Sequence, residues 1–222
     1  MKYHKSSKKK LNILKIFDER NVLINQLKNK KMVTKIIDSS AAELLGKLGQ
    51  ASTAKTDKIA EIINRHSVIA AGAGWIPIPF VDMAVIIGNV WKMYASINTV
   101  IGVSFTANMM KSIGSGVVAN LSSAVVSASL LSILKLIPGL GTVSAGLMLT
   151  AGNYATCTAA GWVYLKALAT IAGEDGIIDP SDPDVKKKLK RAAKSQKEES
   201  RKLKDEIQKK YIIQNNEDKK NK

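Results

Sequence analysis

The sequence predicts an all-α protein: two Gly/Ala-rich apolar helical hairpins forming a compact bundle, flanked by charged amphipathic helices. Three observations support this fold class. Apolar residues recur at helical spacing before the middle of the chain, as at Val33, Ile36 and Ile37. Helix-breaking residues interrupt the apolar middle at two places. A charged stretch with helical periodicity then follows residue 184.

Charge is unevenly distributed along the chain. The 222 residues include 34 basic and 18 acidic side chains, for a net charge of +16. Residues 67–173 contain only five of them, which are Asp82, Lys92, Lys111, Lys135 and Lys166. A soluble domain of this size needs a charged outer surface, because charged groups resist burial. The tails, a partner or lipid must therefore cover this middle, and lipid is the simplest of the three.

Composition divides the chain into three segments. Residues 1–56 form a basic arm with an amphipathic helix at 32–48. Residues 57–173 form the apolar helical-hairpin domain. Residues 174–222 comprise an acidic linker, a charged helix and a tail that is expected to be disordered.

The first hairpin turns at two prolines. The helix that starts near residue 57 must end before Pro77 and Pro79, because proline lacks an amide hydrogen and disfavours helix in the residue before it. Pro79 suits the first turn of a new helix, where Asp82 places a carboxylate near the positive helix end. Asp82 is also a candidate functional intramembrane acid. The helix-start role is the preferred interpretation.

The second hairpin turns in the same manner. It joins helices expected at 117–136 and 142–171, and residues 98–116 would connect the two hairpins. Its turn residues are Pro138, Gly139 and Gly141. Small residues such as Gly161 would allow the helices to approach closely.

Aromatic and basic residues near the segment ends indicate a lipid interface. The uncharged stretches between lysines include residues 112–134 and 136–165, and a membrane span needs about 20 mainly apolar residues. The lipid-interface candidates are Trp75, Trp91, Lys92, Trp162, Tyr164 and Lys166. Both tails are basic, so both termini are expected in the cytoplasm, with two or four membrane spans.

The C-terminal segment combines an acidic linker with a basic helix. The carboxylates of residues 174–184 could bind a cation weakly, but capping and solvation explain them better. The helix expected at 184–211 has only a thin apolar stripe, which predicts that it is solvent-exposed or binds a partner. The stripe residues are Leu189, Leu203, Ile207 and Tyr211.

No combination of residues indicates an enzyme, a metal site or a bound cofactor. The glycines of residues 114–119 match a dinucleotide pattern on paper, but a preceding strand and a following acid are missing. Cys157 is the only cysteine, so it can form neither an intrachain disulfide nor a cysteine-based metal site. His66 lies where an amphipathic helix enters the apolar zone, and an ordinary boundary residue is preferred there over a pH sensor.

The basic tails favour an anionic lipid bilayer as the partner. Nucleic acid is disfavoured, because the tails lack interleaved aromatic residues and a nucleic-acid-binding fold. A polybasic arm beside an apolar core suits anionic phospholipid. The charged tails could also bind a protein partner, and an oligomer is compatible with the sequence.

Two stretches resemble a known family. Residues 66–82, which read His-Ser-Val-Ile-Ala-Ala-Gly-Ala-Gly-Trp-Ile-Pro-Ile-Pro-Phe-Val-Asp, and the later Ile-Pro-Gly-Leu-Gly of 137–141 resemble the YcjF-like bacterial membrane domain of unknown function. That domain is also found attached to Era-like GTPase domains. The resemblance covers about residues 58–171. It implies an all-helical, membrane-associated bacterial protein with no established activity, for which any GTPase would be a separate partner.

Three functions are therefore in question. The first is a non-enzymatic membrane-associated or integral protein that anchors or regulates a partner such as a GTPase. The second is a pore-forming or membrane-perturbing protein whose hairpins insert on contact. The third is a soluble helical scaffold with a buried apolar hairpin.

Overall fold

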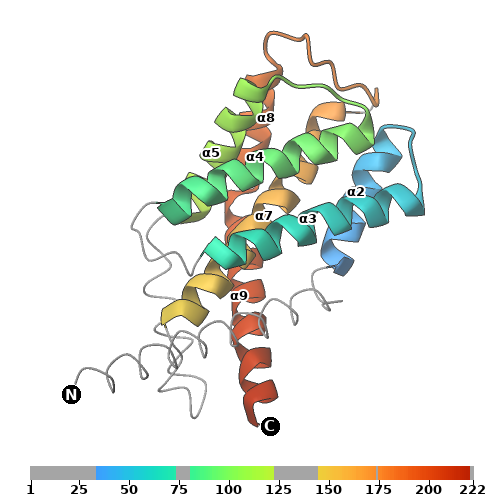
Figure 1. Ribbon diagram of the computed structural model, residues 1–222. Coiled ribbons are helices and arrows are strands. Elements are labelled where there is room, and N and C mark those ends of the chain that lie inside the picture. The colour runs from blue at the N-terminus through green and yellow to red at the C-terminus, as the bar shows by residue number, and fades with distance from the viewer. Residues whose placement is uncertain (1–33, 74–80, 123–144, 174, 221–222) are drawn as a thin grey trace, which may run out of the picture.

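The computed structural model describes residues 34–73, 81–122, 145–173 and 175–220, and over these residues the chain is all-helical (Figure 1). The predicted all-α class is thereby confirmed, while the two hairpins stay a prediction. The helices of the described ranges are α2 Thr34–Lys47, α3 Thr53–Ala73, α4 Val81–Ile101, α5 Ala107–Ser122, α7 Ala145–Ala172, α8 Val185–Ser195 and α9 Lys197–Lys220.

Helix α7 is the centre of the bundle. Apolar side chains lie on every side of its 28 residues, which favours enclosure by other helices. It packs against α2, α3, α4, α5, α8 and α9, and Figure 1 shows it running through the middle of the bundle. Four of these neighbours, α2, α3, α8 and α9, carry charged side chains. Charged helices of the chain itself therefore cover α7, which was the first of the three coverings that the charge distribution allowed.

The contact between α3 and α7 is close because a glycine lies in it. A Cβ atom built at Gly161 would lie 2.9 Å from Cγ1 of Ile63 and 3.0 Å from its Cδ1 and Cγ2. The expectation that Gly161 permits close packing is thus confirmed. Polar side chains also join the two helices, since the Thr158 hydroxyl donates to Ser67 Oγ at 2.9 Å.

Two tyrosines join α4 to α7 through ring stacking and hydrogen bonds. The rings of Tyr94 and Tyr164 stack with their centroids 3.9 Å apart. The Tyr94 hydroxyl donates to the carbonyl of Ala160 at 3.0 Å, and the Tyr164 hydroxyl donates to Asn98 Oδ1 at 2.8 Å. Both rings are buried, and their hydroxyls nevertheless have partners, as buried tyrosines require.

The C-terminal helices pack on the bundle through the thin apolar stripe. All four stripe residues are buried: Leu189, Leu203, Ile207 and Tyr211. Helices α7 and α5 supply the apolar surface that the stripe covers, so these four side chains are not exposed to solvent, and partner binding by this segment stays a prediction. In addition, the ammonium group of Lys204 donates to the Leu121 carbonyl at 2.7 Å, at the negative end of α5. Helix α9 continues to Lys220, where a disordered tail was expected.

The segment expected to connect the hairpins contains most of α5. Gly102, with φ of +74°, ends α4 in the left-handed conformation that suits glycine. Thr106 then starts α5, and its hydroxyl accepts a hydrogen bond from the Met109 amide at 3.3 Å. The hairpin-turn residues Pro77, Pro79, Pro138, Gly139 and Gly141 lie outside the described residues, so the turns stay predictions.

Candidate functional site

The lipid-interface candidates of the first hairpin differ in how exposed their side chains are. Trp75 is not among the described residues. Asp82 is the second residue of α4, and the role of its carboxylate stays a prediction. Trp91 is half-buried, with the Lys111 ammonium 5.2 Å from its ring centroid, while Lys92 is exposed. Of Trp91 and Lys92, the two candidates whose side chains the structure describes here, Lys92 is the exposed one.

The candidates of the second hairpin lie within the protein. Trp162 is 3% exposed and Tyr164 is 1% exposed, because α7 is enclosed by its neighbours. Lys166 forms an ion pair with Glu43 of α2 at 2.8 Å. In this conformation the two aromatic rings contact protein rather than the surroundings of the molecule. The sequence pattern alone could not separate an interfacial aromatic from one that packs under a charged helix.

A polar cluster that the sequence did not reveal lies where α3, α4 and α7 meet. Asn89 Nδ2 donates to the carbonyl of His66 at 2.7 Å and to Cys157 Sγ at 3.6 Å. The amide oxygen of Asn89 therefore faces His66 Nδ1, at 2.8 Å, and His66 Nδ1 carries the donated proton. Asn89 is 23 positions from His66 and 68 positions from Cys157, so no local sequence pattern links the three residues.

This cluster is built for packing and not for nucleophilic chemistry. Cys157 is completely buried, and burial raises the pKa of its thiol to about 12 despite hydrogen bonds with Ser67 and Asn89. A reactive cysteine needs a lowered pKa and access to a substrate. Burial likewise lowers the pKa of His66; Asn89 opposes this effect, and the positive charges of Arg65 and Lys92 reinforce it. The histidine is therefore neutral near pH 7.

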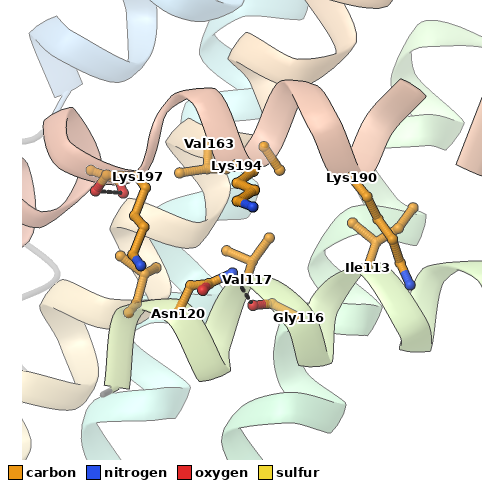
Figure 2. A pocket seen from close by; sticks show the side chains of 11 residues that line it. Ile113, Gly116, Val117, Asn120, Val163, Lys190, Lys194 and Lys197 are labelled. Carbon is orange, nitrogen blue, oxygen red and sulfur yellow. Dashed lines mark hydrogen bonds between the residues drawn. The ribbon is translucent and has the colours of Figure 1, made fainter. Parts of the chain in front are cut away.

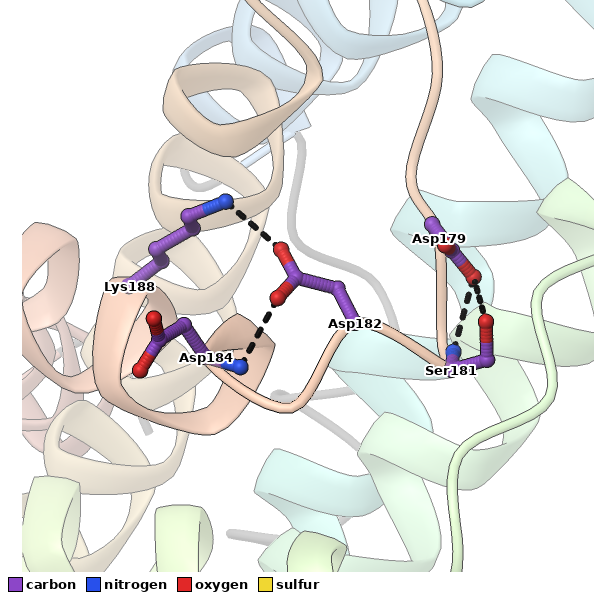
Figure 3. Close-up of polar contacts among 5 residues, drawn as sticks. All are labelled: Asp179, Ser181, Asp182, Asp184 and Lys188. Atoms are coloured by element: carbon purple, nitrogen blue, oxygen red, sulfur yellow. Dashed lines mark hydrogen bonds and ion pairs between the residues drawn. The ribbon is translucent and has the colours of Figure 1, made fainter.

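The acidic linker before α8 is organised by local hydrogen bonds (Figure 3). Asp179 Oδ1 accepts from both the amide and the hydroxyl of Ser181, at 2.8 and 2.6 Å. Asp182 accepts from the Asp184 amide at 2.8 Å and pairs with Lys188 Nζ at 2.6 Å. These contacts hold the pKa of both acceptor carboxylates below its ordinary value. Local turn hydrogen bonds and one ion pair thus account for Asp179 and Asp182, whereas Asp184, at the N-cap position of α8, makes no capping hydrogen bond with its side chain.

Helix α8 presents a continuous basic face. Its 11 residues contain six exposed cations, which are Lys186, Lys187, Lys188, Lys190, Arg191 and Lys194. Its other face, made by Val185, Leu189 and Ala192, is buried against the bundle. Among the described residues, Lys188 alone of the six cations forms an ion pair, with Asp182. The helix therefore presents a dense positive surface, while its opposite face packs on the bundle.

Within the described ranges, no group of three or more histidine, cysteine, aspartate or glutamate side chains could hold a metal ion. In the same part of the chain, no helix combines the length and the hydropathy that crossing a membrane requires.

No protein-family model matches this sequence, and no curated protein or solved structure matches it significantly. The resemblance to the YcjF-like family therefore stays an expectation from the quoted residues.

Proposed function

We propose that this chain is a non-enzymatic, membrane-associated helical protein that binds an anionic bilayer through the basic face of α8. The observation that carries the proposal is the set of six exposed cations in 11 residues, on a helix whose apolar face is already buried. Because its apolar stripe is occupied, α8 would bind a lipid surface by electrostatic attraction rather than by insertion. Anionic headgroups attract such polybasic segments.

Localisation at a bacterial cytoplasmic membrane, with the basic termini on the cytoplasmic side, belongs to the same proposal. The anionic lipid bilayer is then the main partner. The anchoring of a protein partner such as a GTPase rests on the family resemblance. The two alternatives, a pore-forming protein and a soluble scaffold, predict results with vesicles that differ from those of a bilayer-binding protein.

Vesicle co-sedimentation of the full chain tests this proposal. Vesicles of phosphatidylcholine with phosphatidylglycerol should bind the protein, and vesicles of phosphatidylcholine alone should bind it weakly. The triple variant Lys186→Gln/Lys187→Gln/Arg191→Gln should bind the anionic vesicles about a hundredfold more weakly, since each cation near such a surface contributes about 1 kcal/mol. Higher salt should weaken binding further, because surface charges are screened over about 8 Å at physiological ionic strength.

The matched control is Lys202→Gln/Lys209→Gln/Lys210→Gln, which removes the same charge from exposed positions of α9. Its binding should change much less than that of the α8 variant. Equal losses for the two triple variants would show that net charge, and not the α8 face, causes the attraction. Equal binding to both kinds of vesicle would contradict the proposal, and release of an entrapped dye would favour the pore-forming alternative.

A further inference from the structure

A groove with an apolar floor and a basic rim lies between α5 and the junction of α8 with α9 (Figure 2). Its volume is about 260 Å³. Ile113, Val117 and Leu121 of α5 line one side, and Val163 of α7 lies between the two walls. These four side chains come from α5 and from the central helix α7, and all four are buried.

Three lysines form the opposite wall. Figure 2 shows Lys190, Lys194 and Lys197 extending from α8 and α9 toward α5. Lys190 and Lys194 are exposed and Lys197 is partly exposed, so their ammonium groups can reach water and a ligand alike. Among the described residues, those that line the groove include no carboxylate. Three like charges around one gap repel one another, and a bound anion would relieve that repulsion.

We infer that this groove binds one single-chain anionic amphiphile, with its headgroup among Lys190, Lys194 and Lys197 and its hydrocarbon chain along the floor. The charge of the rim selects an anion. The size favours one hydrocarbon chain over two, because 260 Å³ lies below the usual range of about 300–1,000 Å³ for ligand pockets. Lysine stems beside apolar side chains suit such a ligand, since they contact hydrocarbon while the ammonium group remains in water.

The test of this inference is separate from the test of vesicle binding. Lys190 and Lys194 also belong to the basic face of α8, but the vesicle experiment neutralises Lys186, Lys187 and Arg191 instead. A monomeric ligand can occupy the groove whether or not the protein binds a bilayer. The two experiments can therefore fail separately.

Gly116 allows the groove to be blocked without disturbing the fold. It lines the groove, and a Cβ built on it would meet no atom within 4 Å. Replacing a helical glycine in open space removes a flexible residue and should not cost stability. The variant Gly116→Leu should thus fill the groove and stay folded. Gly46→Leu is its control, because Gly46 also faces open space in a helix but is not part of the groove.

Isothermal titration calorimetry of the full chain with dodecanoate, kept below its micelle-forming concentration, tests the inference. We expect saturable binding at one site, retention of this binding by Gly46→Leu, and its loss in Gly116→Leu. The variant Lys190→Gln/Lys194→Gln should bind dodecanoate at least about tenfold more weakly, because charge-assisted contacts to the headgroup are lost. Dodecylamine, which has the same chain and a positive headgroup, should not bind.

Several results would overturn the inference. Absence of dodecanoate binding would do so, as would equal binding by the wild type and Gly116→Leu. Equal binding of dodecylamine would show that the basic rim does not select the ligand. A dimer in light scattering that Gly116→Leu converts to a monomer would show that a second copy of the chain occupies the groove instead.

Discussion

Gly161 in the centre of α7 provides a direct test of the packing between α3 and α7. A methyl group added there would lie 2.9–3.0 Å from three carbons of Ile63, where about 3.5–4.0 Å is optimal for carbon atoms. Overpacking of this kind costs about 1–3 kcal/mol. The gain in helix stability from replacing glycine by alanine offsets about 0.5–1 kcal/mol. Gly161→Ala should therefore lower the free energy of unfolding by up to about 2.5 kcal/mol.

The same reasoning predicts a reversal when Ile63 is shortened. Ile63→Ala removes Cγ1, Cδ1 and Cγ2, which are the three atoms that the new methyl group would meet. That change alone should cost about 2–5 kcal/mol, because it leaves a cavity. In the Ile63→Ala background, Gly161→Ala should then be neutral or stabilising, since its methyl group fills part of the cavity. Urea unfolding followed by circular dichroism measures all four proteins of this double-mutant cycle.

Gly88→Ala in α4 is the matched control. A Cβ at Gly88 would meet no atom within 4 Å, so this substitution should stabilise the protein by about 0.5–1 kcal/mol. The close approach of α3 and α7 would be refuted if Gly161→Ala stabilised the protein as much as Gly88→Ala. It would also be refuted if Gly161→Ala had the same cost with and without the Ile63 side chain.

Three further predictions concern the C-terminal helices and the buried polar cluster. Leu189→Ala should lower the free energy of unfolding by about 2–4 kcal/mol, because the Leu189 side chain is fully buried. Lys187→Ala, at an exposed position of the same helix, should change it by less than about 0.5 kcal/mol. Similar small values for both variants would show that α8 does not pack on the bundle. The free energy of unfolding should be constant above pH 6.5, the ordinary pKa of histidine, and should decrease as the pH falls below it. The reason is that His66 takes up a proton more readily in the unfolded chain than in the folded protein, where it is buried. Urea unfolding at a series of pH values measures this dependence, and His66→Gln should flatten it in that range. Cys157 should not react with a thiol reagent under native conditions and should react fully in denaturant, and rapid native labelling would contradict its burial.

The sequence was sufficient for the fold class and for several helix limits. The amphipathic helix expected at 32–48 is α2, and the apolar helix expected at 142–171 is α7. These segments were predictable because periodicity and helix-breaking residues are local signals. The start of α5 was missed although Gly102 and Thr106 gave an ordinary helix-end and helix-start signal.

Tertiary relations were harder to predict. The shortage of charge in residues 67–173 showed that something must cover the apolar helices, but composition could not choose between lipid and the charged helices of the chain. The apolar stripe of the C-terminal helices packs on the bundle and helps to cover α7; its residues are Leu189, Leu203, Ile207 and Tyr211. In the sequence this stripe looked too narrow to cover another helix, because each of the two C-terminal helices contributes only part of it.

The candidate sites depend on residues that are distant in the sequence. The groove joins side chains of α5 with lysines about 70 positions later, and only the fold brings them together. The basic face of α8 was visible as a charged helix, but its orientation was not. Burial of Leu189 fixes that orientation, because it places the cations of α8 on the outside.

The position of α8 relative to a bilayer is the most direct test of the proposed function. An environment-sensitive fluorophore can be attached to Lys187→Cys in α8 or to Lys58→Cys in α3, both exposed positions, while the buried Cys157 is shielded. We predict a blue-shifted, stronger emission at position 187 on addition of phosphatidylglycerol-containing vesicles, with little change at position 58. An unchanged signal at position 187, or an equal change at both positions, would contradict binding through the basic face of α8.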